Sequence, residues 1–299
     1  MRDDYDVFLD TWEPSPQLRH ATSDAYLSDP VVRERLLKGD DDPDAVTRAA
    51  WSGGPKVMDA DEHVVRQADY FADMQPKWSA DYRDLLLSNG VPTAKIGLIE
   101  EAFRSDWVDG YARRQNTPTM MALKASIRDF DRLCQRSAAG KYVLNPVPET
   151  VQALLTPEQT RALFEANSNL LHVHMPSYLD EFGDPNFAGL NQLYVRRGVF
   201  MPLPEDGIRR ELHYLSSYSL ALGPVEQFAR TWTPASRMTG VPVIFSAPLP
   251  ALQTRTAAFA PFIAGMDLSQ LELVVAPPVE EVPLIAGQEY GGIHEYEFR

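Results

Sequence analysis

Hydrophobic side chains recur at intervals of three and four residues through the first half of the chain, which is the spacing of an amphipathic helix. Clusters of Gly, Pro and Asp at Gly39–Pro43 and Ser52–Pro55 interrupt this pattern. The pattern therefore predicts short helices separated by polar breaks, at Pro30–Lys38, Asp44–Trp51, Ala60–Met74, Ala80–Ser88, Ala94–Phe103 and Thr119–Ser137.

The second half of the chain changes from helical to strand-like spacing. It begins with a helix, because Thr156 is placed to cap it, Pro157 suits a first turn and Gln159 completes a capping box. After Pro176, short apolar runs predict strands, with one helix at Pro224–Thr231 among them. The predicted strands are Gln192–Phe200, Glu211–Tyr218, Val241–Ala247, Leu271–Ala276 and Ile293–Phe298.

A stretch containing Gly and Pro, Ala138–Thr150, separates the two halves and is the predicted connection. We therefore expect an α+β protein with the sheet near its end. In this interpretation, residues 1–145 form an all-helical domain, and residues 146–299 form a domain built around a mixed sheet.

Composition and charge limit the classes of function. The hydrophobic fraction of 44% is typical of a globular protein, and a net charge of −14 disfavours binding of nucleic acid through its phosphates. An acidic amino terminus and the lack of a long apolar run predict no Sec signal peptide and no membrane segment, and hence a chain that is cytoplasmic as made. Cys134 is the single cysteine, and His172 and His174, spaced as on a strand, have no third ligand nearby, so no metal site is expected.

Three polar clusters follow one another in the strand-rich half. A predicted strand ends in Arg196-Arg197-Gly198, the next runs into Ser217-Tyr218-Ser219, and a third begins with Gln270-Leu271-Glu272. A guanidinium at a strand end suits a pyrophosphate, because it forms forked, charge-assisted hydrogen bonds. A fixed carboxylate suits the cleavage of a glycosidic bond, because positive charge develops on the sugar.

This order resembles the arginine, Ser-x-Ser, Gln/Glu-x-Glu signature of mono-ADP-ribosyltransferases of the clostridial-exoenzyme and cholera-toxin-like class. The resemblance covers about the last 110 residues, and Tyr218 stands where the family usually has threonine. It implies that residues 146–299 form a mixed β-sandwich of the ADP-ribosyltransferase kind. It also implies that NAD is the substrate and the only cofactor, and that nicotinamide is released.

The resemblance implies a role for each cluster. Arg197, or its neighbour Arg196 on the opposite face of the strand, would hold the pyrophosphate of NAD. Glu272 would stabilise the ribose cation, while Ser217 and Ser219 brace the sheet and orient this glutamate. Gln270 would orient the acceptor, as in enzymes that modify a group other than arginine. Residues expected to contact NAD also include Gly198, Tyr218 and Phe228.

The resemblance also suggests a bacterial or phage toxin or effector with a macromolecular acceptor, for which protein is favoured over nucleic acid. The segment Arg255–Leu268 would be the loop that recognises the target, with Phe259 and Phe262 exposed for contact. Both phenylalanines are alternatively core residues. The helical domain would serve targeting, delivery, autoinhibition or binding of an immunity partner, with export through a specialised system.

Several alternatives stay open. Glu295-Tyr296-Glu297 also matches the acidic motif, and Glu280 and Glu281 are further candidates for the catalytic acid. Glu272 is preferred because Ile293–Phe298 then supplies a closing strand. A different class of function is also compatible with these motifs: an inactive, ADP-ribosyltransferase-like module that binds a partner, or a helical immunity or adaptor protein whose sheet completes the core.

Overall fold

The computed structural model describes the part of the chain that carries the predicted site. The described residues are 60–107, 117–133, 147–182, 193–203, 208–209, 215–231, 240–276, 282–290 and 292–297. The predicted helices Pro30–Lys38 and Asp44–Trp51 lie outside this set, as do Cys134, Glu280, Glu281 and the predicted domain boundary at residues 145 and 146.

The first described helix, α5 (Ala60–Ser88), corrects a prediction. The sequence indicated two helices with a break around Pro76, because an interior proline removes one backbone hydrogen bond. In the structure the helix continues through Pro76. Phe71 before the proline and Trp78 and Tyr82 after it are all buried in the same core. Tertiary packing on both sides of the proline outweighs its local preference.

The next helices are α6 (Thr93–Glu101), a π-helix (η2, Ala102–Trp107) and α7 (Pro118–Leu133). They coincide with the predicted helices near residues 94 and 119, except that the turn after α6 is π-helical. None of the helices in the described ranges is both long and apolar enough to cross a membrane.

Helix α9 (Pro157–Phe182) begins as the sequence predicted. The backbone N–H of Gln159 donates to the Thr156 hydroxyl at 3.3 Å, and the Gln159 side chain accepts from the Thr156 N–H at 3.2 Å, which is a capping box. The helix then passes through Pro176, so the strand spacing predicted for His172 and His174 is wrong. Beyond Pro176, Tyr178 and Phe182 make tilted and edge-on ring contacts with Tyr70 and Phe71 of α5, which hold the last turns in place.

Seven strands form one mixed sheet in the order β5-β6-β3-β1-β4-β9-β8. All neighbours are antiparallel except β4 and β9, which are parallel. The strands are β1 (Tyr194–Met201), β3 (Ser216–Ser219), β4 (Val241–Pro248), β5 (Thr256–Phe259), β6 (Glu272–Val275), β8 (Ile285–Tyr290) and β9 (Ile293–Glu297). A separate ladder joins β2 (Ile208–Arg209) to β7 (Val282–Pro283). This confirms an α+β fold with a mixed sheet, and a sandwich of two sheets stays a prediction.

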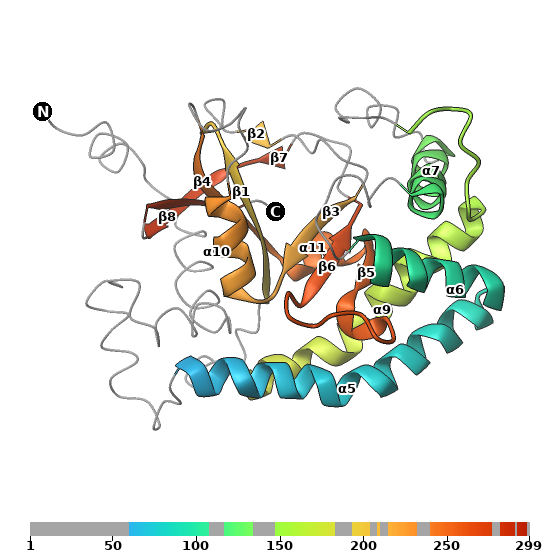
Figure 1. The fold of residues 1–299 in the computed structure, drawn as a ribbon, viewed down its shortest axis with the longest axis horizontal. Coiled ribbons are helices and arrows are strands. Elements are labelled where there is room, and N and C mark those ends of the chain that lie inside the picture. The colour runs from blue at the N-terminus through green and yellow to red at the C-terminus, as the bar shows by residue number, and fades with distance from the viewer. Residues whose placement is uncertain are drawn as a thin grey trace, which may run out of the picture.

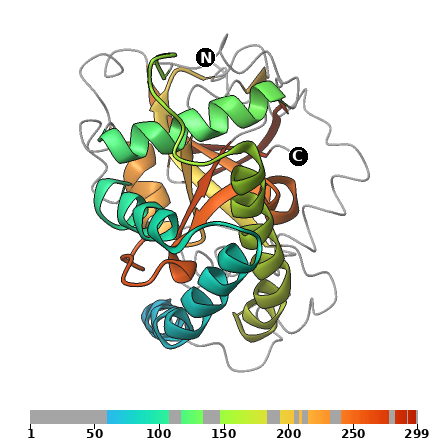
Figure 2. The ribbon, with the colours of Figure 1, turned by 90° about the vertical axis from the view of Figure 1, so that its right-hand side faces the viewer.

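Helices pack on the sheet from different directions. Figure 1 shows α10 (Leu222–Arg230) in front of β1, and Figure 2 shows α6, α7 and α9 in front of the sheet when the molecule is viewed from the right-hand side of Figure 1. Under α10, Val225 and Ala229 pack on Ile244 and Ile293. The short helix α11 (Leu249–Gln253) and the 3-10 turn η5 (Ala260–Phe262) connect the strands.

Helices of the first half and strands of the second half share one hydrophobic core. Phe259 and Phe262 are fully buried and contact Phe71 and Trp78 of α5. The prediction that these two phenylalanines are exposed in a recognition loop is therefore wrong, and the alternative that they are core residues is confirmed. The segment Arg255–Leu268 contains β5 and η5, which the sequence analysis did not predict.

A buried ion pair also joins the two halves. Both Asp131 oxygens of α7 accept hydrogen bonds from the Arg255 guanidinium before β5, at 2.8 and 2.9 Å. The guanidinium lies 5.0 Å from the centre of the Phe164 ring of α9. The helices therefore position the strands that carry the site.

Candidate functional site

The site begins where strands β1 and β3 separate. The two strands pair at one register position, Arg196 with Ser219, and Figure 1 shows them moving apart beyond it. The neighbouring strand β6 pairs with β3 along its length, so that Ser219 faces Glu272. The divergence opens a space that side chains from three strands can reach.

Arg196 borders this opening, but its guanidinium is not placed to bind a ligand. Its side chain is 0% exposed, and its Nε donates to Oε1 of Glu295 at 3.2 Å, while the Ser246 hydroxyl donates to the same oxygen. Arg196, the alternative to Arg197 for holding a pyrophosphate, is therefore engaged inside the sheet. The reason is the parallel pairing of β9 with β4, which the sequence does not reveal and which brings Glu295 close to β1.

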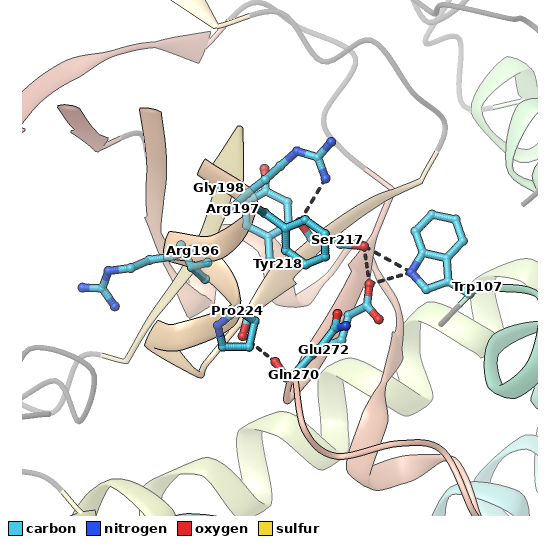
Figure 3. Close-up of a pocket in the computed structure, with 12 residues that line it drawn as sticks. Trp107, Arg196, Arg197, Gly198, Ser217, Tyr218, Pro224, Gln270 and Glu272 are labelled. Atoms are coloured by element: carbon cyan, nitrogen blue, oxygen red, sulfur yellow. Dashed lines mark hydrogen bonds between the residues drawn. The ribbon is translucent and has the colours of Figure 1, made fainter. Parts of the chain in front are cut away.

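Arg197 points in the other direction, into the opening (Figure 3). Its side chain is half-buried, and one Nη donates to the backbone carbonyl of Ser217 at 3.1 Å. It forms no ion pair with any carboxylate among the described residues. A guanidinium that forms no ion pair with a described carboxylate is suited to an anionic ligand.

Glu272 is the carboxylate of the site. It is 5% exposed, and its Oε1 accepts hydrogen bonds from the Ser217 hydroxyl and from the Trp107 indole Nε1, the latter at 2.6 Å. Within the described ranges, Oε2 accepts no hydrogen bond, and it is not fully buried. One oxygen is therefore fixed by protein donors and the other is left for a ligand.

The protonation of Glu272 reflects opposing influences. Burial raises the pKa of this carboxyl above its usual value, because the charged form loses water. The hydrogen bonds from Ser217 and Trp107 and the charge of Arg197 lower the pKa, while Asp267 raises it. The donors and the arginine thus favour the anion at a site whose burial disfavours it.

The remaining predicted residues surround this pair. The Ser219 hydroxyl donates to the backbone carbonyl of Gln270 and accepts from the Ala221 N–H at 2.9 Å, so it links the end of β3 to the start of β6. Gln270 itself precedes the strand, which corrects the prediction that it lies on the same strand as Glu272. Between them Leu271 has a φ of 40°, a left-handed conformation that costs a non-glycine residue about 1–2 kcal/mol.

Gly198 is needed for the contact between β1 and α10. A Cβ at this position would lie 1.9 Å from the carbonyl oxygen of Val225, which is backbone of α10. Only glycine therefore lets the helix pack at this distance. The helix carries Pro224 and Phe228 to the edge of the opening, where Phe228 is 45% exposed.

These residues enclose one pocket, shown in Figure 3, with about 730 Å³ of empty space including its open mouth. The structure brings together every residue predicted for the site. The lining consists of Trp107, Arg196, Arg197, Gly198, Ser217, Tyr218, Ser219, Pro224, Val225, Phe228, Gln270 and Glu272.

Tyr218 differs from the other predicted NAD contacts, since it is also part of the main hydrophobic core. The rival acids do not line the pocket: Glu295 is paired with Arg196, and Glu297 is buried on β9. Across the described ranges, no group of three or more His, Cys, Asp or Glu side chains is placed to hold a metal ion.

Trp107 is the residue that the sequence analysis missed. It lies 165 positions before Glu272, at the end of a helix in the first half, and no local motif marks it. A tryptophan with an apolar body and one N–H donor is a general candidate for pairing with a buried acceptor. Its partner emerges only when the helices are packed on the sheet.

No protein-family model and no curated protein sequence matches the chain. The chain is similar to a solved structure of Vis toxin, an ADP-ribosyltransferase from Vibrio splendidus, with 12% identity, a TM-score of 0.36 and coverage of 79% of this chain and 84% of that one. It is also similar to the ADP-ribosyltransferase Vis in complex with the M6 inhibitor, with 10% identity, a TM-score of 0.37 and coverage of 78% and 83%. These values are low, and no functional conclusion rests on them.

Proposed function

We propose that this protein is an NAD-dependent mono-ADP-ribosyltransferase whose active site is the pocket between Arg197 and Glu272. The observation that carries the proposal is the asymmetric state of Glu272. One carboxylate oxygen is held by two donors, the other is left for a ligand, and an arginine without a described carboxylate partner lies in the same pocket. This arrangement suits a substrate with an anionic part and a reacting sugar.

In this proposal the guanidinium of Arg197 binds the pyrophosphate of NAD. The bond between C1′ of the ribose and the nicotinamide nitrogen breaks, and its electron pair leaves with nicotinamide, which becomes neutral. Glu272 stabilises the positive charge that develops on the ribose and accepts a hydrogen bond from a ribose hydroxyl. The acceptor then bonds to C1′ and loses its proton.

The supporting residues have distinct tasks. Ser217 fixes Oε1 of Glu272, and Ser219 fixes the backbone of Gln270. Gln270, two residues before Glu272 in the pocket lining, would orient an acceptor that is not arginine. Phe228 offers an exposed aromatic face to a flat ring of NAD. The acceptor is a macromolecule, with protein favoured, and the protein acts as a toxin or effector.

The test is release of nicotinamide from NAD by the purified chain, measured by chromatography. Glu272→Gln keeps the shape of the side chain but removes its charge, and we expect a loss of about 100- to 1,000-fold in kcat. Glu297→Gln is a matched control, because Glu297 is as buried (6% against 5% exposed) in the same sheet and does not line the pocket. Thermal unfolding verifies that both variants fold.

A wild-type chain that folds, yet releases no nicotinamide and labels no acceptor in a lysate with tagged NAD, would support the inactive binding module instead. Loss of activity in Glu297→Gln with activity retained in Glu272→Gln would move the catalytic acid to β9. Either result overturns the assignment of Glu272.

A further inference from the structure

The indole of Trp107 reaches the candidate active site from the helical half of the chain. Its Nε1 lies 2.6 Å from Oε1 of Glu272 and 3.2 Å from the Ser217 hydroxyl (Figure 3). The residue ends the π-helix η2 and is 3% exposed. A residue from outside the motif-bearing strands therefore forms a short hydrogen bond to the carboxylate.

The chain around Trp107 holds its ring in a fixed place. Within η2, the Arg104 guanidinium donates to the Ala264 carbonyl at 3.1 Å, and Asp106 accepts a hydrogen bond from Thr117 at the start of α7. Lys124 of α7 places its Nζ 5.8 Å from the centre of the indole ring. Contacts to the segment after η5, to α7 and to β6 thus act on this one turn, and π-helical turns are often found at functional sites.

The hydrogen bond fixes the orientation of the Glu272 carboxylate, which packing of the indole ring alone would not do. Trp107 and Ser217 both donate to Oε1, so rotation of the carboxylate about its last bond would break two hydrogen bonds at once. An indole N–H can donate but cannot accept, and it does not ionise at ordinary pH. It is therefore suited to orient a carboxylate that must stay ionised.

We infer that Trp107 is a positioning residue for Glu272, whose indole N–H holds Oε1 so that Oε2 faces the ribose of the bound dinucleotide. The helical half then supplies part of the active site and does not serve only as a separate targeting or partner-binding unit. This inference rests on the proposed function.

The charged groups around Glu272 determine how removal of the indole N–H changes the pKa of this carboxyl. Arg197 of β1 and Asp267, in the turn before β6, act on Glu272 with opposite signs. Lys124 lies beyond the indole, and burial lowers its pKa to about 8. Loss of the N–H donor removes one influence that lowers the Glu272 pKa, so the acid limb of activity moves to higher pH.

The first test compares two buried tryptophans of the helical half. Trp107→Phe keeps an aromatic ring but removes the donor, and we expect kcat for nicotinamide release to fall about tenfold or more, with a small change in the KM for NAD and an acid limb at higher pH. Trp78→Phe is the matched control, since Trp78 is 2% exposed and stacks on His174 outside the pocket. Equal effects of the two substitutions on kcat and on the acid limb would overturn the inference.

The second test needs neither activity nor a folded Trp107 variant. In nitrogen-15 NMR spectra of the wild-type chain, the Trp107 indole resonance is expected to shift with a single titration that disappears in Glu272→Gln. An indole resonance that does not respond to pH, or that responds equally in Glu272→Gln, would contradict the positioning role. If the resonance titrates with Glu272 but no nicotinamide is released, the hydrogen bond stands and the proposed function fails.

Discussion

Replacement of Gly198 by alanine tests whether the pocket depends on the close packing of α10 against β1. The added Cβ would lie 1.9 Å from the Val225 carbonyl oxygen, 2.7 Å from the Ala229 nitrogen and 2.9 Å from the Val225 carbonyl carbon. A real Cβ contact stays above 3.0 Å, so the backbone of α10 must retreat by at least 3.0 − 1.9, or about 1.1 Å. A helix backbone cannot rotate away as a side chain can.

Overpacking of this kind costs about 1–3 kcal/mol. Because 1 kcal/mol shifts the Tm of larger domains by about 2–4 °C, we expect Gly198→Ala to lower the Tm by several degrees. The retreat also moves Pro224 and Phe228, which line the pocket, so the KM for NAD should rise more than kcat falls. Scanning calorimetry and nicotinamide release measure the two effects.

Gly223→Ala is the matched control, because Gly223 lies on the same helix and a Cβ there meets nothing within 4 Å. We expect its Tm and its KM for NAD to equal those of the wild type or to improve slightly, since alanine is the better helix former. If Gly198→Ala behaves as Gly223→Ala does, α10 is not held against β1 in the way described, and the packing argument is refuted.

Two further predictions concern stability. Burial raises the pKa of Glu272 in the folded chain, so the stability that its protonated form contributes is fully present below the unfolded pKa and is lost as pH rises through the folded pKa. Glu272→Gln should therefore raise the Tm at pH 7–8 more than at pH 4. An equal gain in Tm at both pH values would contradict this. Asp131→Ala leaves the Arg255 guanidinium buried without its carboxylate and should lower the free energy of unfolding in urea by about 3–5 kcal/mol. The double change Asp131→Leu with Arg255→Met should lower it less, because no buried charge is left without its partner. A larger loss for the double change would show that the ion pair itself contributes most of the stability.

The residues that could be predicted from the sequence are those with a local signal. Arg197, Ser217 and Glu272 each belong to a polar cluster next to a short apolar run, and the strands β1, β4, β6 and β9 were visible as such runs. The capping box of α9 is equally local. These features need only a few neighbouring residues to be recognised.

The features that could not be predicted depend on contacts between distant segments. Trp107 meets Glu272 across 165 positions, and Arg196 meets Glu295 across 99. The breaks predicted at Pro76 and Pro176 did not occur, because aromatic packing between α5 and α9 stabilises both helices beyond the proline. The spacing of Phe259 and Phe262 was compatible with a loop or a core, and only the position of α5 decides between them.

In the proposed function, one pocket places the pyrophosphate of NAD at Arg197 and its nicotinamide ribose at residue 272. A crystal structure of the Glu272→Gln variant with NAD, in which slow turnover preserves the dinucleotide, tests it most directly. We expect phosphate oxygens within hydrogen-bond distance of the Arg197 guanidinium and a ribose hydroxyl on the side-chain atom that replaces Oε2. NAD bound elsewhere, or turned so that adenine faces residue 272, would contradict it.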